Sequence, residues 1–203
     1  MKLFYAAGSP YARIIRVVLR EAGLENSVAE QEVTLRDPNS ALLPHNPGGK
    51  VPTLQLDNGT CLNESLLVLA YLDTRHGGRR LLPMDGSDGW RIMAETGRAY
   101  AFLDAVTVWN RELRFGLKAP GVIALERERA ERAADGFEAA LGAGGYSGPI
   151  DAGQIVLGAA LENIARRHKV WPWQPGRPRL AGFLAAMSRR PSFASTVQPE
   201  LDL

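Results

Sequence analysis

The chain has 203 residues, with 24 basic and 22 acidic side chains and a formal net charge of +2. This balance gives no strong field for nucleic acid or an anionic membrane surface, and no apolar run approaches the roughly 18 residues that cross a bilayer. Cys61 is the only cysteine, which excludes an intramolecular disulfide, a CxxC redox motif and a multi-cysteine zinc site. The three histidines are scattered, so we expect no metal site. The N-terminus has the pattern of a strand and not of a signal peptide, and we expect a cytoplasmic protein.

The first part of the sequence has the pattern of a small α/β unit. Ser9 and Pro10 suit the N-cap and the first position of a helix, because the serine hydroxyl accepts a backbone N–H and proline needs no acceptor there. Gly23 is expected to end this helix, and Asp57-Asn58-Gly59 is a hairpin turn signal. The expected elements are a strand over residues 2–5, the helix that ends at Gly23, a strand over 28–35, a short helix or irregular loop over 38–43, strands over 51–56 and 61–62, and a helix over 66–75.

The second part of the sequence contains no convincing strand. Residues 76–89 are rich in Gly, Pro, Asp and Ser, as is typical of a linker. Asp151 and Gln154 have the spacing of a helix capping box. We therefore expect a domain over residues 1–76, a linker over 77–89 and an all-helical domain over 90–203. The expected helices cover residues 90 to about 117, 123–141, 151–168 and 180–190.

Six motifs follow one another in a characteristic order and spacing: MKLFYAAGSPYARIIRVVLREAGL at the N-terminus, NPGGKVPTL at residues 46–54, LNES at 62–65, LLVLAYLD at 66–73, IDAGQIVLGAAL at 150–161 and RRPSF at 189–193. Together they resemble the cytosolic glutathione transferases, and the last two are similar to a capped core helix and a C-terminal signature of bacterial members. The resemblance covers nearly the whole chain. It implies a glutathione transferase fold, with an α/β thioredoxin-like N-terminal domain, an all-α C-terminal domain and a homodimer.

In this family the sulfur of glutathione attacks an electrophile, and only the thiolate is reactive. The resemblance therefore implies a group that lowers the pKa of the bound thiol, which is about 8.5 when free. Ser9 is the candidate, because a hydroxyl at a helix N-terminus adds a hydrogen-bond donor to the positive end of the helix dipole. Tyr5 is the alternative, since some classes use a tyrosine near this strand end. Some bacterial members have a cysteine where Pro10 stands, so we expect no cysteine-based chemistry.

Two further segments are implied to bind glutathione. Val51–Pro52 resembles the family's cis-proline step, which turns the N–H and C=O of Val51 toward the cysteinyl backbone of glutathione, as in pairing with an added strand. Ser65, at a helix N-terminus, is expected to bind the γ-glutamyl carboxylate, and Glu64 the neighbouring ammonium. Lys50 is the candidate for the glycyl carboxylate.

The resemblance implies a glutathione S-transferase that conjugates glutathione, its co-substrate, to a small hydrophobic electrophile in detoxification, with no further cofactor. Two alternatives remain open: a glutathione-dependent peroxidase or reductase, and a glutathione-binding carrier or partner protein with little turnover. Tyr100 departs from the family pattern, since many members have an aspartate there, often near the glutathione of a partner subunit. The expected partners are glutathione, the electrophile and a second copy of the chain, with no nucleic acid and no membrane.

Overall fold

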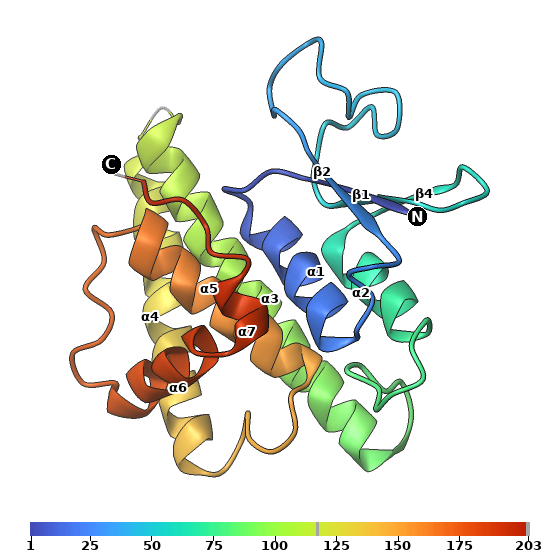
Figure 1. The fold of residues 1–203 in the computed structure, drawn as a ribbon. Coiled ribbons are helices and arrows are strands. Elements are labelled where there is room, and N and C mark those ends of the chain that lie inside the picture. Colours follow the sequence, from blue (N-terminus) through green and yellow to red (C-terminus); the bar gives the residue numbers. More distant parts are fainter. Residues whose placement is uncertain (117, 202–203) are drawn as a thin grey trace. The chain divides into compact units, whose positions relative to one another are not determined.

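The first of two structural units combines the N-terminal part of the chain with a short segment close to the C-terminus (Figure 1). The structure is a computed structural model that describes residues 1–116 and 118–201. Unit 1 comprises Met1–Leu82 and Pro191–Gln198, and unit 2 comprises Pro83–Arg190 and the residues after Gln198. Within the described ranges, no helix is long and apolar enough to cross a membrane.

Unit 1 contains a four-stranded mixed sheet with the strand order β2-β1-β3-β4. β1 and β2 are parallel, and the other neighbouring pairs are antiparallel. Leu3, Phe4 and Leu54 of the two central strands are buried, whereas no residue of the edge strand β2 is. The thioredoxin-like mixed sheet is therefore confirmed. The strands are β1 (Lys2–Tyr5), β2 (Ala29–Glu32), β3 (Thr53–Gln55) and β4 (Cys61–Asn63).

Helix α1 (Pro10–Glu21) begins and ends where the sequence predicts. Ser9 is its N-cap and Pro10 follows at the first position. At the other end Gly23 has a φ of 65°, which is the left-handed conformation that glycine adopts without a Cβ clash. The N–H of Leu24 donates to the C=O of Leu19, and the N–H of Gly23 to the C=O of Arg20. These two bonds form a Schellman motif, which satisfies carbonyl groups at the helix end.

Helix α2 (Ser65–Asp73) packs against α1 and ends in a carboxylate that holds the following segment. Asp73 is fully buried and accepts hydrogen bonds from the N–H groups of Leu81 (2.6 Å) and Leu82 (3.2 Å) and from Arg80 Nε (2.6 Å). Burial opposes the charge of Asp73, but these hydrogen bonds outweigh it and lower the pKa of the carboxyl group. Residues 77–82, predicted as linker, therefore belong to unit 1.

Unit 2 is all-helical, and its centre is helix α5, in which every residue from Ala152 to Ile164 is buried. The Asp151 carboxylate accepts from the N–H of Gln154 at 3.0 Å, which confirms the predicted N-cap. Helix α3 begins at Gly86, inside the predicted linker, because Asp85 supplies an N-cap backbone and Asp88 an acidic first turn. The predicted end of this helix near Leu117 lies outside the described residues. The helices are α3 (Gly86–Arg114), α4 (Pro120–Gly142), α5 (Ala152–Arg167) and α6 (Pro178–Ser188).

The segment Pro191–Gln198 was not expected in unit 1, because the predicted helical domain extends over residues 90–203. In the structure it contains the short helix α7 (Pro191–Ala194), which packs on α1. The burial of Phe193 and Ser192 in unit 1 accounts for this position. The boundary between the units therefore crosses the RRPSF motif at Arg190.

Candidate functional site

Three of the predicted segments meet at one end of the sheet. The register pairs Phe4 of β1 with Thr53 of β3, and Thr53 with Asn63 of β4. At this end β1 and β4 finish and β3 begins. Three segments therefore lie at the same end of the sheet: the turn that leads to Ser9, the Val51–Pro52 step and the Glu64–Ser65 pair.

Ser9 occupies the N-cap of α1 with extended backbone angles, φ −88° and ψ 118°. Its Oγ accepts a hydrogen bond from the N–H of Ala12 at 3.2 Å. A hydroxyl can accept and donate at once, so this cap leaves the Ser9 proton available to an anion. The first turn of α1 contains no acidic side chain that would neutralise the positive end of the helix. Ser9 thus caps α1 and keeps a hydroxyl proton free for a further acceptor.

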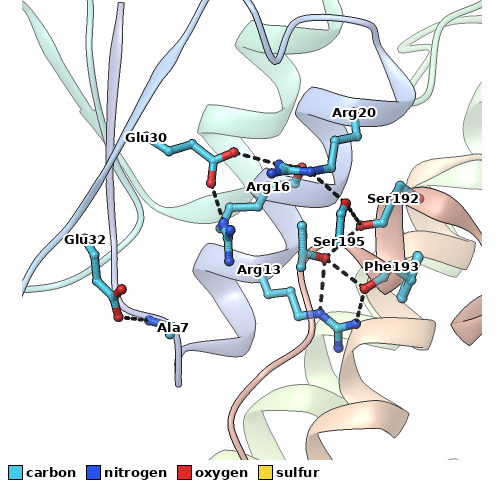
Figure 2. Close-up of polar contacts among 10 residues, drawn as sticks. Ala7, Arg13, Arg16, Arg20, Glu30, Glu32, Ser192, Phe193 and Ser195 are labelled. Carbon is cyan, nitrogen blue, oxygen red and sulfur yellow. Dashed lines mark hydrogen bonds and ion pairs between the residues drawn. The ribbon is translucent and has the colours of Figure 1, made fainter.

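Tyr5 is the last residue of β1, and its ring is covered by an arginine. The Arg16 guanidinium lies 4.2 Å from the ring centroid and forms an ion pair with Glu30 (Figure 2). Arg16 is seven residues from Ser9, which corresponds to about 10 Å along the helix axis. The Tyr5 ring thus lies between the Arg16 guanidinium and a buried cluster that includes Ala12 and Val51.

The peptide bond between Val51 and Pro52 is cis, as the family resemblance implies. Both residues are buried, while Lys50 is exposed and its ammonium contacts no described partner. Among residues 1–116 and 118–201, neither the N–H nor the C=O of Val51 has a hydrogen-bond partner. An extended ligand next to Val51 could therefore form two backbone hydrogen bonds, one with its N–H and one with its C=O.

The loop before the cis bond is organised by Asn46, to which the sequence reasoning gave no role. Its Oδ1 accepts from the N–H of Gly48 (3.0 Å), and its Nδ2 donates to the C=O of Lys50 (2.9 Å) and to Thr53 Oγ1 (3.0 Å). Thr53 Oγ1 also lies 3.0 Å from Asn63 Oδ1 on β4. The Asn-x-Gly spacing is typical of an Asx turn and could have identified Asn46. Asn46 and Thr53 thus connect the loop at Val51 with the strand that leads to Glu64.

Residues 38–43 were expected to form either a short helix or an irregular loop. In the structure they form a loop with turns and no helix.

Glu64 and Ser65 form the entrance to α2. Glu64 has a φ of 68°, which is rare for a residue with a side chain and costs about 1–3 kcal/mol. The first intrahelical bond runs from the N–H of Val68 to the C=O of Glu64, so the N–H groups before Val68 have no acceptor in the helix. Ser65 is buried at the first helical position, and Glu64 is exposed. A carboxylate could be bound by these N–H groups and the Ser65 hydroxyl.

The part of the chain that the structure describes contains no cluster of metal-ligating side chains. No group of three or more His, Cys, Asp or Glu side chains there is placed to hold an ion. The half-buried Cys61 contacts the C=O of Gly59 at 3.7 Å, on the hairpin between β3 and β4.

Comparisons with known proteins find relatives in both sequence and fold. The family described as "Glutathione S-transferase, N-terminal domain" matches residues 3–80. An uncharacterised GST-like protein of Escherichia coli K12, YibF, is 25% identical over 98% of this chain and 100% of its own.

Two similar solved structures also contain glutathione. A glutathione transferase family member from Pseudomonas fluorescens Pf-5, with bound glutathione, is 33% identical and has a TM-score of 0.89, with 98% of this chain and 99% of that chain covered. A glutathione S-transferase from Methylobacillus flagellatus KT, also with glutathione bound, is 30% identical with a TM-score of 0.88, over 97% of this chain and 98% of that chain. Because sequence and fold agree over almost the full length, the chain belongs to the cytosolic, bacterial-type glutathione S-transferase family.

Proposed function

We propose that the chain is a glutathione transferase that binds glutathione at this end of the unit 1 sheet and conjugates it, through a new bond from its thiolate sulfur, to a small hydrophobic electrophile, which loses a leaving group or takes up a proton. One observation carries the proposal. The Ser9 hydroxyl caps α1 through an accepted hydrogen bond, which leaves its proton for the thiolate, at a helix end with no acidic residue in its first turn.

The required energy is within reach of these groups. Lowering a thiol pKa from about 8.5 by two units takes about 2.7 kcal/mol of differential stabilisation. A hydrogen bond to a charged group contributes about 1.5–3 kcal/mol, and the helix N-terminus adds up to about 1 kcal/mol at an exposed position. Ser9 and α1 together can therefore keep a large part of the bound thiol ionised near neutral pH.

The rest of glutathione matches the other two segments. The unpaired N–H and C=O of Val51 suit the cysteinyl backbone, and the N-terminus of α2 with Ser65 suits the γ-glutamyl carboxylate. The exposed Glu64 and Lys50 carry the charges that complement the ammonium and the glycyl carboxylate. The glutathione bound in both similar structures supports this assignment.

Tyr5 remains the alternative donor, but its environment favours Ser9. The Arg16 guanidinium lies over the Tyr5 ring, whereas the Ser9 hydroxyl stands at the N-cap of α1 itself. The test is the ultraviolet absorbance of the bound thiolate against pH. We expect Ser9→Ala to raise the pH of half-ionisation and to lower turnover about 10- to 150-fold. Ser9→Thr, which keeps a hydroxyl, should retain most of both properties.

The same titration separates the rival interpretations. A larger shift in Tyr5→Phe than in Ser9→Ala would assign the thiolate contact to Tyr5. A wild-type protein that binds glutathione without lowering its thiol pKa would be a carrier, contrary to our proposal. Turnover of a peroxide in place of an aryl halide would indicate a peroxidase.

A homodimer, a cytoplasmic location and a role in detoxification are part of the proposal. Leu66 and Leu67 on the first turn of α2 are 42% and 62% exposed, and Trp90 at the start of α3 is 61% exposed. A second copy of the chain that covers such side chains would remove apolar surface from water. We expect sedimentation at micromolar concentration to give twice the 22.1 kDa mass of one chain. A species of single-chain mass would contradict the dimer.

A further inference from the structure

The last segment of unit 1 is attached to α1 by a buried arginine. The Arg13 guanidinium donates to the C=O of Phe193 (3.2 Å) and lies 3.5 Å from Thr196 Oγ1. It also packs over the Phe193 ring, 5.2 Å from the centroid, and Arg20 donates to Ser195 Oγ (Figure 2). These contacts hold residues 191–196 along one side of α1.

The segment ends at a residue that contacts the turn before Ser9. Gln198 is fully buried, and its Nε2 donates to the C=O of Gly8 at 3.1 Å. Gly8 is the residue directly before Ser9 in the chain. A side chain 190 positions away thus binds the peptide group that enters the α1 N-cap.

This contact fixes the plane of one particular peptide group. The C=O of Gly8 and the N–H of Ser9 belong to the same planar unit, and the N–H donates to the C=O of Ala6 at 2.9 Å. Both ends of the plane are therefore held. In the Ala6–Ala7 peptide group, whose C=O accepts from Ser9, the N–H of Ala7 donates to the Glu32 carboxylate at 3.2 Å (Figure 2).

The plane turns when ψ of Gly8 and φ of Ser9 change. A rotation in which these two angles do not compensate each other would displace the start of α1, and the Ser9 hydroxyl with it, relative to β1. Gly8 offers little resistance, because a residue without Cβ accepts a wide range of backbone angles. The hydrogen bond from Gln198 is what opposes the rotation on the carbonyl side.

We propose that Gln198 is a positioning residue for Ser9, through which the C-terminal segment sets how well the bound thiolate is stabilised. This inference rests on the proposed function of Ser9. It predicts that the amide of Gln198, and not the docking of the segment in general, affects the ionisation of glutathione.

The test compares substitutions at two positions of the same segment in the full-length protein. Gln198→Met keeps the length of the side chain and removes the donor; Gln198→Glu keeps the shape and removes the donor when ionised. Thr196→Val, the matched control, perturbs the contact with Arg13 and leaves the Gly8 contact in place. Each variant is titrated with glutathione by thiolate absorbance, and S-methylglutathione affinity and the unfolding midpoint are measured beside it.

We expect Gln198→Met to raise the thiol pKa and to lower kcat/KM by about ten-fold, as a small displacement of a catalytic group does. Thr196→Val should lower the unfolding midpoint and leave the thiol pKa at the wild-type value. In a Ser9→Ala background, Gln198→Met should have no further effect on the thiol pKa, because Gln198 acts through Ser9. The Ser9 amide should also exchange its hydrogen faster in Gln198→Met.

The outcomes distinguish this inference from the function on which it rests. If Ser9→Ala shifts the thiol pKa but Gln198→Met and Gln198→Glu do not, Gln198 is only structural and the inference is wrong. The same conclusion follows if Thr196→Val gives an equal shift. If Ser9→Ala itself leaves the titration unchanged, the proposed thiolate contact fails, and the positioning role with it.

Discussion

The pH dependence of unfolding provides a sharp test of the packing in unit 2, because that unit buries a histidine. His168 follows α5 and is fully buried. Its ring packs edge-to-face on Trp109, with centroids 4.3 Å apart, and Nδ1 lies 3.4 Å from the amide nitrogen of Asn110. The other nitrogen, Nε2, is buried with no hydrogen-bond partner among the described residues. A proton on Nδ1 would face the Asn110 amide donor, so the site favours the neutral ring.

Burial lowers the pKa of His168 from 6.5 to about 4. Between pH 6.5 and about pH 4, the histidine is therefore protonated in the unfolded chain and neutral in the folded chain. The contribution of the neutral ring to stability is complete above pH 6.5 and is lost as the pH falls toward 4. The difference between the two pKa values corresponds to about 3 kcal/mol of unfolding free energy. Linkage gives a loss of about 2 kcal/mol between about pH 7 and pH 5.

The assay is denaturant unfolding at several pH values, followed by tryptophan fluorescence. All four tryptophans (Trp90, Trp109, Trp171 and Trp173) lie in unit 2, so the signal reports on the helical unit. His168→Gln should lose about 2 kcal/mol less than wild type over this pH interval. His45→Gln removes a half-buried histidine of unit 1 and serves as the control. Equal pH dependence in wild type and His168→Gln would refute the reasoning, whatever the stability of the variant at neutral pH.

Two further predictions concern helix N-termini. Asp151→Ala should lower the unfolding free energy by about 1 kcal/mol, because the N–H of Gln154 loses its acceptor; a wild-type denaturation midpoint would show that the cap is not stabilising. Glu64→Ala combined with Ser65→Ala should weaken S-methylglutathione binding by at least about 2 kcal/mol, because charge-assisted contacts to the γ-glutamyl end are lost; calorimetric titration that gives the wild-type affinity would contradict this assignment.

The features that the sequence predicted correctly are mostly local. Ser9-Pro10 and Asp151 cap helices through bonds to residues three positions away, and Gly23 ends α1 because of its own backbone freedom. Such signals are contained in a few neighbouring residues. The cis bond before Pro52 followed from the family resemblance and not from local chemistry.

The features that were missed depend on contacts between distant residues. Nothing near Arg13 in the sequence indicates that its guanidinium is buried against Phe193, 180 positions away. The end of the predicted linker is a related case, because the N–H groups of Leu81 and Leu82 donate to the buried Asp73 carboxylate, eight and nine positions earlier.

The assembly of unit 1 from Met1–Leu82 and Pro191–Gln198 has a consequence for biosynthesis. Domains of a nascent chain generally fold as units, the N-terminal one first. Here the ribosome must translate the whole helical unit before Phe193 can fill its place on α1 and before Gln198 can reach Gly8. A truncated chain of residues 1–82 would leave the Arg13 guanidinium without its acceptor on Phe193. Emergence of residues 191–198 from the ribosome is therefore the event that completes the fold around Ser9.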